Sequence, residues 1–229
     1  MYINLKTYLL QARLLMNQND LLSKASELGG MTIMQLAQHL QLRPPTDTLH
    51  TKGWLGQAVE IFLGAQAGCL PIPDFPDLNI ELKTIPLNAN GRVAESTYVT
   101  TLPLLNLLEL SWEQSSCYKK LQTVLWIPVE SSKNIPLLQR RIGQPHLWSP
   151  NGVQMNVLKE DWEMLTEMVL KGQVEKIDGS LGQFLHIRPK AANAKALTKS
   201  LDEHANVIQT CPRGFYLRTR LTNQILAST

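Results

Sequence analysis

The chain has 229 residues, a size that suits one mid-sized domain or two small lobes sharing a core. Hydrophobic residues make up 44% and charged residues 18%, which is typical of a folded globular protein rather than a disordered chain. No apolar run is long enough for a transmembrane helix, and the first twenty residues lack the pattern of a signal peptide. The sequence therefore predicts a cytoplasmic protein without a membrane partner.

Charge is distributed unevenly along the chain. Residues 1–115 hold seven Lys and Arg against ten Asp and Glu, whereas residues 116–229 hold fifteen against nine. A basic half beside an acidic half is typical of a protein that grips a polyanion with one lobe and processes it with the other. A protein with an ordinary uneven surface charge gives the same pattern. Charge alone therefore does not distinguish the two interpretations, and sequence motifs are needed.

The N-terminal part of the chain is predicted to be helical and then extended. The elements, in chain order, are a helix that Thr32 caps and Pro44 ends, a helix over 54–65, a strand over 80–85 and a strand over 96–102. The last two are separated by the turn Asn88–Gly91, so we expect them to pair as a hairpin.

The C-terminal part alternates between the two periodicities. The elements are a helix-like stretch over 113–121, a strand over 124–130, a helix over 158–170, a strand over 184–188, a helix over 191–201, a strand over 214–220 and a helix over 221–227. Because 124–130 is almost continuously apolar, it is expected to be a buried central strand. Helices flanking a sheet of mixed direction indicate an α/β or α+β layered fold.

Several classes of site are absent from the sequence. The three cysteines and five histidines show no metal-binding spacing. Neither the serine hydrolase, the zinc protease nor the phosphate-loop signature is present.

One oxygen-rich group remains as a candidate site, at the start of the strand over 80–85. Glu81 and Lys83 project to the same face because side chains alternate along a strand, and Asp74 enters from the preceding loop. Two carboxylates and the Leu82 carbonyl form an all-oxygen site of the kind Mg²⁺ prefers. Lys83 beside it can orient or deprotonate a water molecule and offset phosphate charge. This pattern suits metal-assisted phosphodiester hydrolysis, although the same residue types also occur on ordinary solvated strands.

Glu60 adds a further carboxylate on the preceding helix. It lies between Gly56 and Gly64, which share its helix face at four-residue spacing. Glycines beside a carboxylate allow a ligand or another backbone to approach closely. The alternative is a Glu that simply faces solvent.

Six sequence blocks together resemble a known family. They are KGWLGQAVEIFLGAQAG, DFPDLNIELKTIP, VLWIPVE, RRIGQPHLWSP, IRPKAANAKAL and PRGFYL, in this order between about Leu21 and Leu226. The chain is thus similar to the MutH family of DNA mismatch repair endonucleases. This resemblance implies a restriction-endonuclease-like fold, with a mixed central sheet flanked by helices and two lobes around a DNA cleft. The expected lobes are 1–115 with the metal and catalytic site and 116–229 with most DNA-recognition residues, in one structural domain overall.

The resemblance also implies an activity and its partners. A member of the family is a monomeric, Mg²⁺-dependent endonuclease that nicks the unmethylated strand of double-stranded DNA at hemimethylated GATC sites. Its activating partner is the mismatch-repair ATPase MutL.

Site residues follow from the matching positions. The catalytic positions that match are Asp74, Glu81, Lys83, Glu60 and Lys120, of which Asp74, Glu81 and the Leu82 carbonyl would hold the metal. The DNA-contacting positions that match are Lys52, Gly53, Arg188, Pro189, Lys190 and Tyr216, with Tyr216 sensing adenine methylation. Tyr98 departs from the family, which has Phe there, and Lys119 departs from a His.

Two other functions stay open at this point. A restriction enzyme of the same superfamily would cut both strands as a symmetric dimer. A DNA-binding module could keep the fold without catalysis, although the intact Asp74, Glu81 and Lys83 argue against it.

Overall fold

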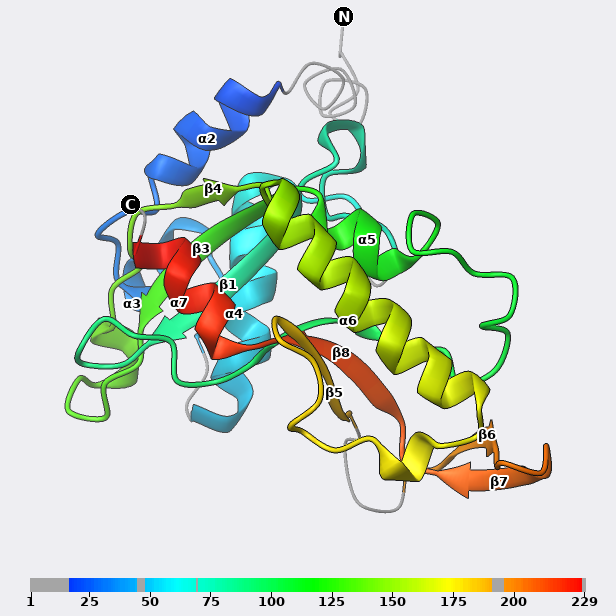
Figure 1. Ribbon diagram of the computed structural model, residues 1–229. Coiled ribbons are helices and arrows are strands. Elements are labelled where there is room, and N and C mark those ends of the chain that lie inside the picture. Colours follow the sequence, from blue (N-terminus) through cyan, green and yellow to red (C-terminus); the bar gives the residue numbers. More distant parts are fainter. Residues whose placement is uncertain (1–16, 45–47, 69, 191–195, 228–229) are drawn as a thin grey trace, which may run out of the picture. The chain divides into compact units, whose positions relative to one another are not determined.

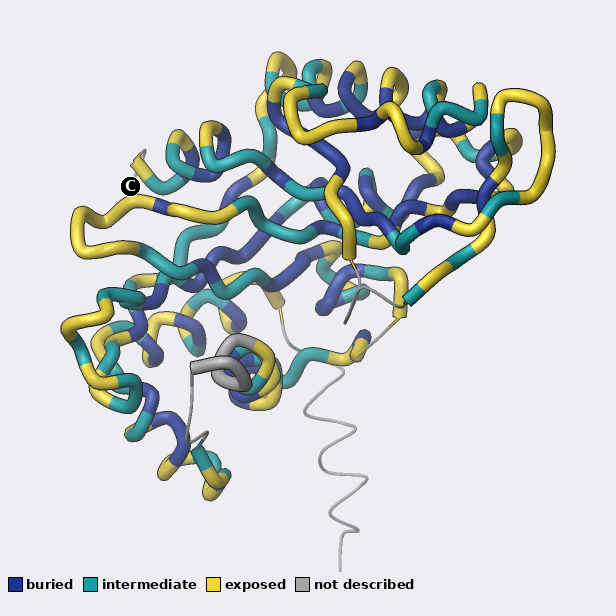
Figure 2. Tube along the Cα trace, turned by 90° about the horizontal axis from the view of Figure 1, so that it is seen from below, coloured by how far each residue is buried: buried dark blue, intermediate teal, exposed yellow. Residues whose placement is uncertain are grey.

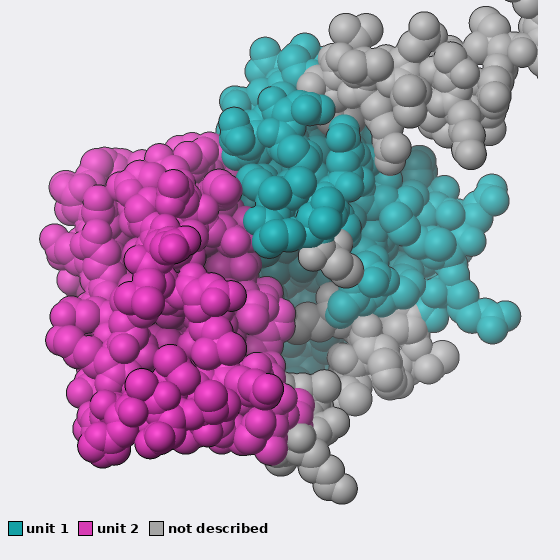
Figure 3. All heavy atoms as spheres, turned by 90° about the vertical axis from the view of Figure 1, so that its right-hand side faces the viewer, with its two compact units in different colours: residues 1–91, 124–147 teal, residues 92–123, 148–229 magenta. Residues whose placement is uncertain are grey.

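The computed structural model describes residues 17–44, 48–68, 70–190 and 196–227, with the backbone alone over 48–52. The chain divides into two compact units, coloured separately in Figure 3. The first unit comprises residues 1–91 and 124–147, and the second comprises 92–123 and 148–229. Figure 1 labels the α-helices and most strands of both units.

The first unit contains a parallel strand pair covered by helices. Its elements are α2 (Gln18–Ser26), α3 (Ile33–His39), α4 (Thr48–Leu63), η1 (Pro76–Leu78), β1 (Glu81–Leu87), β3 (Val124–Glu130), η2 (Leu137–Gln139) and most of β4 (His146–Trp148). The sheet order is β1-β3-β4. β1 runs parallel to β3, with Glu81 opposite Val124 and Leu87 opposite Glu130.

The helices of this unit begin where the sequence provides caps. Thr32 and Gln35 form a reciprocal capping box at the start of α3, as expected for Thr32. One continuous core then joins α2, α3 and α4 to the apolar residues of β1 and β3. β3 is nearly all buried, as its apolar sequence predicts. Figure 2 colours the buried residues of the chain dark blue and the exposed ones yellow.

The second unit is built on antiparallel strands. Its elements are β2 (Thr97–Thr101), α5 (Ser116–Leu121), α6 (Gly152–Leu170), η3 (Val174–Lys176), β5 (Leu185–Pro189), β6 (Thr198–Leu201), β7 (Val207–Thr210), β8 (Arg213–Leu217) and α7 (Thr219–Ala227). β8 lies between β2 and β5, while β6 and β7 form a separate two-stranded sheet.

A buried carboxylate fixes the start of β5. Asp161 on α6 is 6% exposed and accepts backbone N–H groups from Gln183 at 2.7 Å, Phe184 at 2.6 Å and Leu185 at 2.8 Å. Gly182 permits this tight approach at φ +82°, a left-handed conformation that glycine adopts without steric cost. The helix therefore sets where β5 begins.

The predicted mixture of helices and strands is confirmed, but two expectations are wrong. The strand over 96–102 does not form a hairpin with the strand over 80–85, because β2 pairs with β8 and β1 pairs with β3. Residues 198–201 form strand β6 rather than a helix, and 191–195 lie outside the described residues. The first error concerns pairing with a strand that is distant in the sequence, which local periodicity does not encode. In the second, residues 198–201 pair with the nearby β7, so a local hairpin replaces the expected helix.

The bounds of the two units differ from the lobes expected at 1–115 and 116–229. Parallel pairing draws β3 into the first unit, and 92–115 belongs to the second. The first unit holds nine Lys and Arg against eight Asp and Glu, and the second holds thirteen against eleven. The charge contrast between the sequence halves is therefore not a contrast between units. In the described part of the chain, no helix is long and apolar enough to cross a membrane.

Candidate functional site

A short loop brings Asp74 to the start of β1. Phe75 and Ile80 bond to each other through both backbone amides, at 2.9 and 3.2 Å, and Asn79 turns the chain at φ +53°. The loop thereby folds back on itself, and the Asp74 carboxylate accepts the Leu82 N–H at 2.8 Å. Asp74 is 7% exposed. The loop thus holds a buried carboxylate against the first residues of the strand.

Glu81 and Lys83 form an ion pair on one face of β1. Glu81 is 1% exposed and the Lys83 side chain 20% exposed, so the carboxylate is buried while the ammonium keeps access to solvent. A buried carboxylate is costly without a compensating charge. Lys83 therefore compensates the buried Glu81 carboxylate, and two of its three ammonium hydrogens remain for other acceptors.

Helix α4 passes beside this strand. A Cβ built on Gly56 would lie 3.9 Å from Thr84 Oγ1, and beyond the helix end the Gln66 N–H donates to the Asp74 carbonyl at 2.9 Å. The helix therefore runs antiparallel to β1, and Glu60 lies on it between these two contacts. Glu60 is half-buried.

Oxygen atoms supply the donor set at this site. Asp74 and Glu81 offer carboxylates and Leu82 a carbonyl, all hard donors that suit Mg²⁺. Within the described ranges, no three Asp, Glu, His or Cys side chains gather closely enough to hold a metal ion. Glu60 is therefore not brought into a three-acid group with Asp74 and Glu81.

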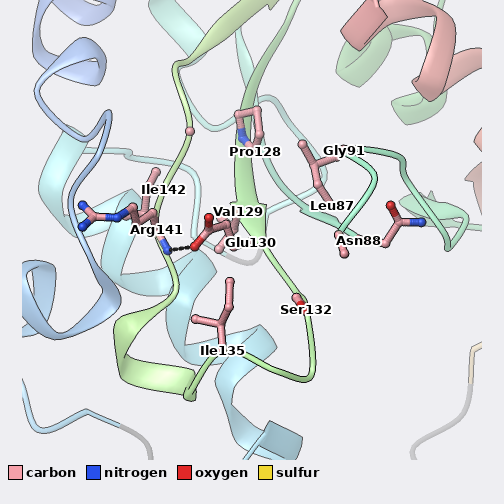
Figure 4. A pocket seen from close by; sticks show the side chains of 12 residues that line it. Leu87, Asn88, Gly91, Pro128, Val129, Glu130, Ser132, Ile135, Arg141 and Ile142 are labelled. Atoms are coloured by element: carbon pink, nitrogen blue, oxygen red, sulfur yellow. Dashed lines mark hydrogen bonds between the residues drawn. The ribbon is translucent and has the colours of Figure 1, made fainter.

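The first unit also has a pocket of about 400 Å³ that is separate from these acids (Figure 4). It lies at the opposite end of β1, where Leu87 and Val129 face Ile135 and Ile142. Glu130 on its wall accepts the Arg141 backbone N–H at 2.8 Å. Six residues of strand separate Leu87 from Glu81, or roughly 20 Å, and no predicted site residue lines the pocket.

In the second unit, the predicted DNA-contacting residues lie at a strand corner. Arg188 and Pro189 end β5, opposite Gly214 and Arg213 of β8. The Lys190 N–H then donates to the Pro212 carbonyl at 2.7 Å. Arg188, Pro189 and Lys190 are all exposed. The corner therefore presents two basic side chains to solvent from a fixed backbone.

The ammonium of Lys190 rests on the ring of Tyr98, with Nζ 3.3 Å from the ring centroid. The Tyr98 hydroxyl bonds to Thr101 Oγ1 at 2.9 Å. A Cβ on Gly214 would come within 2.8 Å of Tyr98 Cε2, so only glycine leaves room for this ring. The sequence showed Tyr98 only as a departure from the family and gave no sign of its contact with Lys190.

Tyr216 lies on the central strand of the same sheet. It is half-buried, whereas its neighbour Phe215 is 1% exposed on the opposite face. Burial raises the pKa of the Tyr216 phenol, and Tyr98 adds to this while Arg188 opposes it. The phenol is therefore neutral at physiological pH.

The remaining predicted residues lie on helices α5 and α4. Lys120 is half-buried on α5 of the second unit. Gly53 is exposed on α4, and the side chain of Lys52 lies outside the described residues. His186, which the sequence did not single out, is buried beside Tyr216.

Comparison with known proteins identifies the family. A family model described as DNA mismatch repair enzyme MutH matches residues 63–161. The DNA mismatch repair protein MutH of Shewanella baltica is 46% identical over 92% of this chain and 94% of its own. The proteins of the same name from Serratia proteamaculans and Escherichia coli are 46% and 48% identical, over 92% of both chains. Identity at this level over nearly the whole length shows that the chain belongs to the MutH family of DNA mismatch repair endonucleases.

Proposed function

We propose that this protein is a cytoplasmic, Mg²⁺-dependent endonuclease that nicks the unmethylated strand of duplex DNA at hemimethylated GATC sites. The observation that carries the proposal is the group at the start of β1. Asp74, Glu81 and Lys83 are three residue types that phosphodiester hydrolysis requires, and they lie within one turn and strand. Family membership supports the assignment to mismatch repair.

In the proposed mechanism, the carboxylates of Asp74 and Glu81 and the Leu82 carbonyl would hold the metal ion. When bound, Mg²⁺ supplies neutralisation of the scissile phosphate and makes a water molecule more acidic. Lys83 donates one hydrogen to Glu81 and orients the attacking water with another. In-line attack at phosphorus then breaks the bond to the 3′ oxygen, which leaves a 5′-phosphate and a 3′-hydroxyl. Glu60 and Lys120 are assigned supporting catalytic roles by their matching positions.

Recognition of the site is assigned to the second unit and to α4. Arg188 and Lys190 are both exposed at the C-terminal end of β5, where side chains can reach base edges or phosphates. Lys52 and Gly53 would contact the DNA backbone. Tyr216 would tolerate the hydrogen of an adenine amine and collide with a methyl group on it, a specificity device based on steric exclusion.

Strand-resolved digestion tests the proposal. Duplexes with one GATC site, unmethylated, hemimethylated or fully methylated, are incubated with the protein and Mg²⁺, with and without a chelator. In hemimethylated DNA we expect a nick in the unmethylated strand, whereas fully methylated DNA should be nicked far more slowly and no duplex should be nicked with the chelator. Binding without any cleavage would contradict catalysis and leave a DNA-binding module.

The proposed partner and assembly are tested on supercoiled plasmid. We expect a monomer in sedimentation, an open circular product, and a faster rate when MutL and ATP are added. A dimer that linearises the plasmid at a rate unaffected by MutL would instead indicate an autonomous restriction endonuclease.

A further inference from the structure

Three rings form a row across the antiparallel sheet of the second unit. Tyr98 on β2 and His186 on β5 are both directly opposite Tyr216 on β8. Residues directly opposite each other on adjacent strands project to the same face. The ring centroids of Tyr98 and Tyr216 are 5.4 Å apart at 67°, and those of Tyr216 and His186 are 6.3 Å apart at 82°. Tyr216 therefore has an edge-to-face neighbour on each side.

The ring of His186 is held at both nitrogens. Its Nε2 lies 3.0 Å from Ser96 Oγ and its Nδ1 3.5 Å from the Gly179 carbonyl. The side chain is 6% exposed. A neutral imidazole has one donor and one acceptor nitrogen, so it can satisfy both contacts in a single orientation. The two hydrogen bonds thus fix the orientation of the His186 ring, which lies beside the Tyr216 ring.

The Tyr216 ring has no such anchor of its own. Its hydroxyl makes no hydrogen bond with any of the residues that the structure describes. The position of the phenol therefore depends on the rings that flank it, and the Tyr98 side of the row also carries Lys190. On the other side of the row, the His186 ring lies edge-to-face with Tyr216.

We propose that His186 is a positioning residue that fixes the Tyr216 ring and thereby sets how strongly the enzyme rejects methylated adenine. This inference rests on the proposed role of Tyr216 in sensing methylation. A steric filter works only if the colliding group cannot move aside, and His186 removes that freedom. An edge-to-face pair contributes enough to change a ratio of rates by about three- to tenfold.

The charges around His186 give the role a pH signature. The groups that face it are Arg218 after β8, Arg188 on β5, Asp161 on α6 and Tyr216 on β8. Burial lowers the pKa of His186 below its ordinary 6.5, and Arg218 lowers it further, whereas Asp161 acts in the opposite direction. The neutral ring is therefore the stable form above pH 6.5, and its contribution is lost as the pH falls through the lowered pKa.

The test compares two substitutions at His186 with a matched control. H186L removes both hydrogen bonds and the ring, whereas H186Q retains a donor and an acceptor and cannot titrate. H204A changes an exposed histidine on the turn between β6 and β7 and is the control. The measured quantity is the ratio of nicking rates on hemimethylated and fully methylated GATC duplexes, from pH 5.5 to 8.

We expect H186L to lower this ratio about three- to tenfold at every pH. H186Q should retain most of the ratio and abolish its decline at low pH, and H204A should behave as the wild type. In a Y216S background, H186L should have no further effect, because His186 acts through Tyr216. An unchanged ratio in a folded H186L protein, or an undiminished effect in the Y216S background, would overturn the proposal.

A second measurement separates this inference from the proposed function. The ring resonances of Tyr216, assigned by loss in Y216F, are compared between wild type and H186L without DNA. We expect a shift and broadening as the ring becomes mobile. If the wild type does not discriminate between methylated and unmethylated adenine, the proposed function is wrong. If the Tyr216 resonances are the same in wild type and H186L, the proposal that His186 fixes the Tyr216 ring is wrong, whatever the result for the function.

Discussion

At the scale of single residues, the chemistry depends on how two buried carboxylates are held. Asp74 is tied to the Leu82 amide and Glu81 to the Lys83 ammonium. Each partner lies on β1, so the strand itself determines the separation of the two acids. Removal of Lys83 would change both the position of the Glu81 carboxylate and the charge around it. The substitutions below are therefore chosen to keep the size of each side chain.

Substitution of Glu81 by Gln or of Lys83 by Met should abolish nicking while duplex binding is retained. Gln keeps the size of Glu81 without its charge, and Met keeps the aliphatic stem of Lys83. A positioned proton donor or acceptor contributes about 10²–10⁴ in rate, so the K83M rate should fall by at least about a hundredfold. Single-turnover nicking at saturating Mg²⁺ measures this.

The matched control is D77N, which removes an exposed carboxylate from the same loop. Its rate should equal that of the wild type. Nicking by E81Q or K83M at the control rate would show that the active site lies elsewhere.

A second prediction concerns Lys190, whose backbone the Pro212 carbonyl fixes. Lys190→Ala should reduce the preference for GATC over unrelated duplexes more than it reduces binding to both. One base-edge contact is worth about 1–3 kcal/mol of discrimination, which corresponds to roughly tenfold or more. Competition binding with single-base-pair variants of the site gives the preference directly. The control is K199A, which replaces an exposed lysine on β6. If Lys190→Ala reduces affinity equally for every duplex, Lys190 contacts a phosphate and not a base.

At the scale of elements, the position of β5 depends on α6. β5 carries His186 and Arg188, and its first residues are bonded to the Asp161 carboxylate of the helix. Three N–H groups converge on the two carboxyl oxygens, whose lone pairs are enough to accept all three. Helix α6 thus positions β5 and, with it, Arg188 at the end of the strand.

Asp161→Asn should destabilise the second unit because the amide nitrogen would face N–H groups of the β5 start. A buried donor left without an acceptor costs about 1–3 kcal/mol. Urea unfolding compares D161N with E160Q, an exposed neighbour on the same helix that should unfold like the wild type. Equal midpoints for the two variants would show that the three hydrogen bonds do not anchor the strand.

At the scale of the whole molecule, basic residues are concentrated in one segment of the sequence and not in one of the two units. From Gln183 to the C-terminus there are seven Lys and Arg against two acids, although the second unit as a whole is nearly balanced. The proposed contribution of the second unit to DNA binding therefore comes from this C-terminal basic segment and not from the net charge of the unit.

DNA affinity should accordingly fall steeply with salt, because each neutralised phosphate releases counterions. The slope of log affinity against log salt should become shallower by about one unit in Arg188→Ala if Arg188 contacts a phosphate. The slope is measured by fluorescence anisotropy with a catalytically inactive variant. The salt concentration is varied from about 50 to about 200 mM. An affinity that is flat across this range would contradict a role for the basic segment.

The sequence by itself determined the local features of this protein. The cap at Thr32, the buried strand over 124–130 and the shared face of Glu81 and Lys83 all follow from spacings of four residues or fewer or from a short apolar run. Such features depend on backbone geometry that is the same in any fold.

Only the tertiary structure decided which strands meet. It paired β1 with β3 and β2 with β8, and it thereby placed Tyr98, Tyr216 and His186 in one row although Tyr98 and Tyr216 are 118 positions apart in the sequence. It also showed that the basic half of the sequence is not a basic unit. Pairing is decided by the burial of both faces of each strand against distant parts of the chain, and no local periodicity carries that information.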